Sequence, residues 1–213
     1  MKKTFCVLIM LSLLLCLSAC SLPSHGTDVP AVNVLKRPAV EMSYEDTDNG
    51  RLLTFSYVPR TADELSAIDL CDEYSAACAV LFALAEYEED PESSIEMLSA
   101  VRGPEEVSTY DINFLKNQFD QYPYVIRSYF DGTSPSESYA VDKDSPVSIL
   151  ITENIYSRDE KGYVKLFFTS SGADSPRSVT LRLKESTGQW FLFSDSYMGL
   201  CSGIRSPEDD GWD

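Results

Sequence analysis

Histidine is almost missing from this sequence. Its 213 residues contain one, His25. That residue lies in a polar, proline-containing stretch without periodicity, residues 21–38, which predicts a flexible tether. A Ser-His-Asp triad, a Cys-His pair and a histidine-liganded zinc site each need a histidine inside the folded part. The sequence after the tether therefore excludes these three kinds of site.

Cysteine is also scarce. Beyond position 20 the sequence holds Cys71, Cys78 and Cys201, and an odd number is not typical of a disulfide framework. Cys71 and Cys78 would lie about 10 Å apart along one helix, too far for a bridge, although either could pair with Cys201. We expect all three to be buried as small apolar residues. Their spacing is not that of a zinc knuckle, so we expect no metal ion, and nothing indicates a cofactor.

Basic residues are few. The chain has 17 lysines and arginines against 34 acidic residues, a formal net charge of −17. Within residues 61–120 the basic residues are Arg102 and Lys116 alone. A surface this negative repels phosphate polymers, so we expect no nucleic acid as a partner. We expect a solvated acidic face that keeps the protein soluble, and the alternative is an interface for a basic partner.

Long apolar runs are absent beyond the N-terminus. After a basic start, an apolar run extends from Phe5 to Leu17. It is shorter than the roughly 20 residues that cross ~30 Å of hydrocarbon, which is typical of an export signal. Leu17-Ser18-Ala19-Cys20 follows at once and resembles the lipobox of bacterial lipoproteins. The resemblance implies a cleaved signal peptide, residues 1–19. It also implies a diacylglyceryl group on Cys20 that anchors the chain to the extracytoplasmic face of the cell membrane.

A β-hairpin, residues 39–60, is expected after the anchor and tether, residues 20–38. Apolar residues alternate with polar ones on both sides of Asp48-Asn49-Gly50. An Asn-Gly pair tolerates the positive φ angles of a type I′ turn.

Helical periodicity dominates residues 61–120. Thr61 and Glu64 form a capping-box pattern ahead of a helix expected over residues 62–89, whose apolar residues recur as one stripe. Asp90-Pro91 indicates the start of a second helix. Ser108 followed by Asp111 indicates a third.

The period changes to two in residues 121–213. Four apolar-alternating runs, each bounded by turn residues, predict strands: 147–151, 164–168, 179–183 and 189–193. Short connections favour an antiparallel meander. We therefore expect an α+β fold in which about three N-terminal helices pack on a small antiparallel β-meander or barrel. Residues 61–207 are expected to form one domain.

Several sequence blocks, in the order in which they occur, carry a resemblance to a known protein family. They are Ile68–Ala77, Arg102-Gly103-Pro104, Arg127–Phe130, Gly172–Arg177 and Gln189–Leu192. Over residues 62–207 the chain resembles an uncharacterised family of bacterial proteins that is frequent in clostridia. The resemblance implies no catalytic residues. The last hairpin is also similar to that of exported domains with the nuclear-transport-factor-2-like cone fold, which is the alternative fold.

Aromatic and basic residues gather in the second half of the chain. Tyr, Trp and Arg dominate binding hot spots, so the candidate binding residues are Tyr124, Arg127, Tyr129, Arg177 and Trp190. The alternative is that these side chains fill the joint between helices and sheet, each polar atom finding an internal partner.

Carboxylates are the remaining option for acid–base chemistry. Glu88, Glu89, Asp90 and Glu92 cluster between two predicted helices, where caps and dipole partners are also expected. We expect a lipoprotein whose folded part is a non-enzymatic binding or interaction module for an envelope protein, a peptide or a glycan. The alternatives are a carboxylate-dependent cell-wall glycan hydrolase and a scaffold for another envelope protein.

Overall fold

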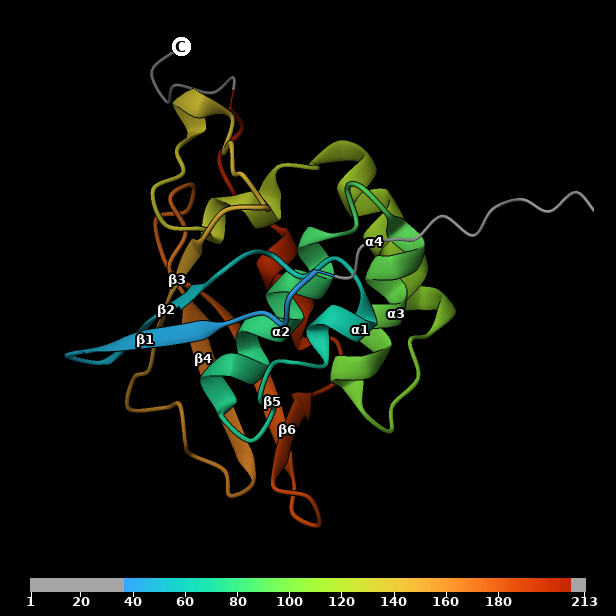
Figure 1. Ribbon diagram of the computed structural model, residues 1–213, viewed down its shortest axis with the longest axis vertical. Helices are drawn as coiled ribbons and strands as arrows, with labels where there is room; N and C mark the ends of the chain where they lie inside the picture. Colours follow the sequence, from blue (N-terminus) through green and yellow to red (C-terminus); the bar gives the residue numbers. More distant parts are fainter. Residues whose placement is uncertain (1–36, 208–213) are drawn as a thin grey trace, which may run out of the picture. The chain divides into compact units, whose positions relative to one another are not determined.

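The computed structural model describes residues 37–207, which combine helices with an antiparallel sheet and so form an α+β fold (Figure 1). Six strands lie in the sheet in the same order as in the chain. They are β1 (Met42–Thr47), β2 (Gly50–Phe55), β3 (Val147–Thr152), β4 (Tyr163–Phe168), β5 (Arg177–Lys184) and β6 (Gln189–Leu192). The likeness of the last hairpin to the cone fold stays a prediction.

The expected arrangement of about three N-terminal helices packed on the sheet is not confirmed, although the α-helices of the described residues lie within the segment 61–120 or one residue beyond it. Four α-helices lie between β2 and β3: α1 (Ala62–Leu65), α2 (Glu73–Ala85), α3 (Pro91–Arg102) and α4 (Thr109–Gln121). Three short 3-10 helices follow: η1 (Val125–Tyr129), η2 (Pro135–Glu137) and η3 (Ser196–Cys201). Because β2 pairs with β3 along its whole length, the early hairpin belongs to the same sheet as the late strands.

One long helix over residues 62–89 does not form. The Asp69 carboxylate accepts a hydrogen bond from the Cys71 backbone N–H at 2.8 Å, and Asp72 accepts one from Ser75 N–H as the N-cap of α2. These aspartates bind the backbone locally and so break the helix into α1 and α2. Cys71 is therefore exposed, contrary to our expectation, whereas Cys78 and Cys201 are buried, and all three are free thiols.

The caps predicted for the later helices are confirmed. Asp90 accepts hydrogen bonds from the backbone N–H groups of Glu92 and Ser93 at the start of α3, and Pro91 occupies the first turn. Ser108 and Asp111 form a reciprocal capping box at the start of α4.

The first hairpin forms where it was expected, but its turn is not type I′. The strands end at Thr47 and resume at Gly50, and none of residues 48–50 has a positive φ. A side chain at Gly50 would overlap the carbonyl oxygen of Ile151 on β3. The glycine therefore serves the close approach of two strands rather than the turn.

Helix α2 is the centre of the fold. It was expected to show one apolar stripe, but every residue from Tyr74 to Ala85 is buried. A helix that is apolar all round must be covered on all sides. The sheet lies against one side and contacts α2 through β4, β5 and β6, and α3 packs on another (Figure 1). The Phe82 ring lies 4.9 Å from that of Phe55 on β2.

The last three strands present two different faces. Toward α2 they place apolar residues with no exposed surface, such as Val164, Leu166 and Leu181. The alternate positions point outward, and pairing sets Tyr163 opposite Arg182 and Arg182 opposite Phe191. Strand alternation thus leaves an aromatic and basic outer face.

No helix within residues 37–207 is long and apolar enough to cross a membrane. The predicted signal peptide, Cys20 and most of the tether lie outside the described residues.

Phe82→Ala should lower the free energy of unfolding by about 3–5 kcal/mol, because it opens a cavity between α2 and the sheet. The control is Ile155→Ala, whose side chain is 83% exposed and whose loss should cost less than about 0.5 kcal/mol. Urea unfolding followed by circular dichroism measures both variants. Equal losses would contradict the central role of α2.

Candidate functional site

Tyr124 and Arg127, two of the predicted binding residues, are engaged inside the fold. The half-buried Tyr124 ring stacks on that of Tyr139 at 5.6 Å, and Tyr139 donates a hydrogen bond to the carbonyl oxygen of Arg205 at 2.7 Å. Arg127 donates to both carboxylate oxygens of Glu88 at 3.0 Å.

Tyr129 and Arg177 meet around the C-terminal segment, residues 200–203. Buried Tyr129 donates its hydroxyl to the carbonyl oxygen of Leu200 at 2.8 Å, and burial raises the pKa of that hydroxyl. Arg177 donates to the carbonyl oxygens of Ser175, Ser202 and Gly203. Both side chains therefore hold this segment against the sheet.

Trp190 stands apart from the other four. It lies half-buried on β6, and its backbone N–H donates to the carbonyl oxygen of Leu70 at 2.8 Å. Tyr129 and Arg177 also line different hollows. The five residues do not form one patch, and the contacts of Tyr124, Arg127, Tyr129 and Arg177 fit the reading in which such residues fill joints between elements.

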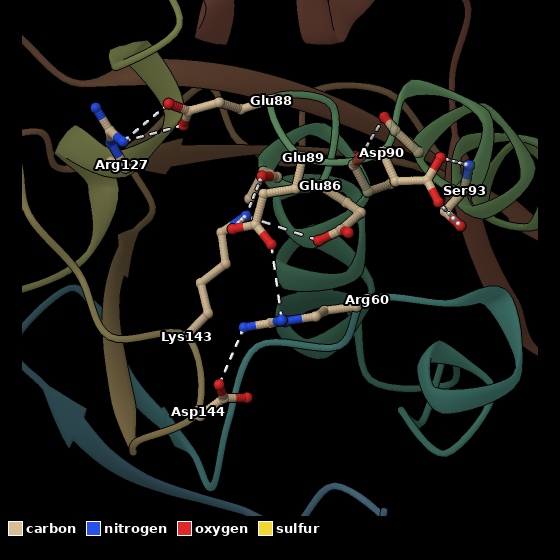
Figure 2. Close-up of polar contacts among 12 residues, drawn as sticks. Arg60, Glu86, Glu88, Glu89, Asp90, Ser93, Arg127, Lys143 and Asp144 are labelled. Carbon is tan, nitrogen blue, oxygen red and sulfur yellow. Dashed lines mark hydrogen bonds and ion pairs between the residues drawn. The ribbon is translucent and has the colours of Figure 1, made fainter. Parts of the chain in front are cut away.

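The acidic cluster between α2 and α3 is a network of ion pairs (Figure 2). Lys143 is 6% exposed and places its ammonium 2.8 Å from a carboxylate oxygen of Glu89 and 3.6 Å from one of Glu86. It also donates to the carbonyl oxygen of Ala85. Arg60 joins from the loop after β2, 3.7 Å from Glu89.

Three of the four acids named from the sequence have structural partners here. Glu88 pairs with Arg127, Glu89 with Lys143, and Asp90 caps α3, while Glu92 is exposed in the first turn of that helix. Sequence reasoning missed Glu86 and Lys143, which are the buried members. Glu86 continues the apolar spacing of α2 one turn after Phe82, and that spacing was the available signal for its burial.

Burial dominates the ionisation of Glu86. Loss of water raises the pKa of this carboxyl to about 7, although Lys143 opposes the shift. The hydrogen bond from Lys143 lowers the pKa of Glu89. The Lys143 ammonium thus lies between the Glu89 carboxylate, whose pKa is lowered, and the buried Glu86 carboxyl, whose pKa is raised.

The outer face of β4–β6 has a different character. We call it the basic face and define it by Lys161, Tyr163, Lys165, Phe167, Arg182, Lys184, Phe191 and Phe193. The Tyr163 and Phe193 rings meet edge to face at 4.9 Å. Arg182 lies over the Tyr163 ring at 5.7 Å, and Lys184 lies near the Phe191 ring at 6.0 Å.

The four cations of the basic face form no ion pair with a carboxylate of the described residues. Nine other basic residues within residues 37–207 form ion pairs with carboxylates, and Arg177 is bound by carbonyl oxygens. Besides Arg177, the basic residues that pair with no carboxylate of the described chain are Lys161, Lys165, Arg182 and Lys184. Unpaired positive charge is therefore concentrated on this face of an acidic protein.

A groove of about 460 Å³ lies on the basic face, and the turn after α3 forms its other wall. That wall comprises Arg102, Pro104 and Glu105. Between them Gly103 has a φ of 65°, and a side chain there would overlap the Phe191 ring. Glycine at this position lets the end of α3 rest directly on β6.

Glu86→Gln should flatten the pH dependence of stability between pH 5 and 8. The raised pKa of Glu86 means that its stabilising contribution is complete below its ordinary pKa of 4.5 and is lost as the pH rises through about 7. The free energy of unfolding of the parent should therefore fall over this interval relative to the variant, by roughly 1–2 kcal/mol after solvent screening.

Urea unfolding at several pH values measures this difference. The control is Glu96→Gln, an exposed glutamate of α3, which should keep the parent's pH dependence. A Glu86→Gln variant that follows the parent at every pH would contradict the assignment.

Comparison with known proteins bears on most of the folded unit. The family described as a domain of unknown function, DUF6935, matches residues 57–208, which confirms the expected likeness to an uncharacterised family. The match covers α1–α4, β3–β6 and the residues that line the groove. No curated protein and no solved structure matches the chain significantly. The chain belongs to the DUF6935 family, a domain of unknown function.

Proposed function

We propose that this protein is a lipoprotein anchored through Cys20 on the extracytoplasmic face of the cell membrane, and that its folded unit is a non-enzymatic binding module. The basic face is the ligand site. The anchor rests on Leu17-Ser18-Ala19-Cys20 and the export signal before it. The tether is long enough to present the unit up to ~60 Å from the bilayer, at ~3.5 Å per residue.

The binding proposal rests on four neighbouring cations that form no ion pair within the described residues. Acidic residues outnumber basic ones two to one, yet Lys161, Lys165, Arg182 and Lys184 have no carboxylate partner among the described residues. Like charges gathered on one face repel one another and destabilise the fold slightly. A local arrangement that costs stability without a compensating contact indicates a functional site.

The shape and rigidity of the groove support the same conclusion. Its volume of about 460 Å³ falls within the roughly 300–1,000 Å³ of small-ligand pockets, which combine apolar walls with a few polar groups. Tyr163, Phe191 and Phe193 supply the apolar walls. Tyr163 lies on β4 and Phe191 on β6, and strands hold these two side chains more firmly than a loop would, which favours a preformed site.

Cys20→Ser should abolish lipid attachment, because the hydroxyl of serine does not replace the thiol that takes the diacylglyceryl group. We expect release into the medium or retention as an unprocessed precursor. Membrane fractionation with immunoblotting and mass analysis of the N-terminus measure both outcomes. A variant that is processed and held at the membrane like the parent would refute the anchor.

The double variant Arg182→Glu/Lys184→Glu should bind isolated envelopes of the producing organism at least about tenfold more weakly than the parent, a factor equal to 1.4 kcal/mol. Both side chains are exposed, so the fold should survive, which circular dichroism checks. The control, Lys116→Glu/Arg205→Glu, changes the net charge equally on other surfaces. If both variants bound like the parent, the basic face would not be the ligand site.

A further inference from the structure

We infer that the ligand of the basic face is a short anionic oligosaccharide, with a sugar ring against the aromatic side chains and its carboxylate or phosphate groups at the surrounding cations. This inference rests on the proposed function and adds the chemical class of the ligand. Charge, groove composition and the acidity of the rest of the chain carry it.

The cations lie among several aromatic rings: Arg182 lies over that of Tyr163, Lys165 over that of Phe167 and Lys184 near that of Phe191. Lys161 and Lys165 lie two residues before and after Tyr163 along the chain, and Arg182 is its cross-strand partner. Lys184 lies two residues further along β5. Alternate residues of a strand are about 7 Å apart, so the positive charges are spread over a surface the size of one or two sugar rings. A ligand with several anionic groups spaced along its length meets them best.

The composition of the groove favours a saccharide over an acidic peptide. A sugar needs an apolar surface for its C–H face, donors for its ring and carboxylate oxygens, and acceptors for its hydroxyl groups. Tyr163 and Phe193 supply the apolar surface, and Arg182 supplies hydrogen-bond donors. Glu105 and Glu185 line the same groove and supply the acceptors. An acidic peptide offers these two carboxylates only its backbone N–H groups, whereas a sugar offers several hydroxyl donors on each ring.

The charge of the whole chain limits the length of the ligand. The formal net charge is −17, so a long polyanion that ran past the basic face would meet an acidic surface. Repulsion there would offset the contacts made in the groove, and it is weakly screened at low ionic strength. A ligand that fits within about 460 Å³ avoids this cost.

Isothermal titration calorimetry on the purified protein tests the inference with four probes. Trigalacturonate represents carboxylated oligosaccharides and mannose 6-phosphate represents phosphorylated sugars. Maltotriose is the neutral control, and hexaglutamate is the acidic peptide. We expect one or both anionic sugars to bind at least about tenfold more tightly than maltotriose and hexaglutamate, with binding that weakens as salt is added.

Two variants locate the site. Arg182→Glu/Lys184→Glu should weaken anionic-sugar binding at least about tenfold, and Tyr163→Ala should weaken it severalfold by removing the stacking surface. Lys116→Glu/Arg205→Glu should leave it unchanged. Equal loss in this control would show non-specific attraction and overturn the inference.

The other outcomes separate the ligand class from the proposed function. A different outcome is that hexaglutamate binds more tightly than either anionic sugar and loses that binding in the Arg182→Glu/Lys184→Glu variant. That result would overturn the saccharide as the ligand class but leave the basic face as the binding site. No binding of either anionic sugar at millimolar concentration would also overturn the saccharide. The basic face as the ligand site would fall if the same variant still bound isolated envelopes like the parent.

Discussion

The complete burial of α2 is the constraint on which the rest of the structure depends. A helix with apolar residues on every side cannot lie at a surface, so the sheet covers one side of it and α3 another. Both ends need polar partners within this enclosure. Asp72 caps the first turn, and Lys143 donates to the carbonyl oxygen of Ala85 in the last. The ion pairs of Lys143 with Glu86 and Glu89 follow from its position at that end.

The burial of α2 also explains why the two faces of the sheet differ in composition. The inner positions of β4 and β5 must be apolar because they contact α2. The outer positions do not contact α2 and need not be apolar. There Lys165, Arg182 and Lys184 have no carboxylate partners among the described residues. Stability is concentrated on one face, and the other is free to carry a binding site.

Residue type alone does not distinguish a side chain that binds a ligand from one that fills a joint inside the fold. Tyr124, Arg127 and Tyr129 are of the kinds that dominate interfaces, but an amphipathic side chain is equally suited to a joint between helices and sheet. Tyr129 reaches the carbonyl oxygen of Leu200 and Arg127 reaches Glu88. The single helix expected over residues 62–89 was wrong for a related reason, because Asp69 and Asp72 bind the backbone locally and outweigh the apolar periodicity.

Local properties were determined by the sequence itself: the lack of histidine after the tether, the caps at Asp90 and Ser108, and the alternation along β4 and β5. Each depends on neighbours within a few positions. The basic face depends on contacts between distant segments. Tyr163, Arg182 and Phe191 become neighbours through strand register, and the end of α3 completes the groove because Gly103 rests on Phe191. Only the tertiary structure decides these contacts, since strand register depends on which face is buried against α2 as well as on the turns, and the packing of α3 on β6 joins segments far apart in the sequence.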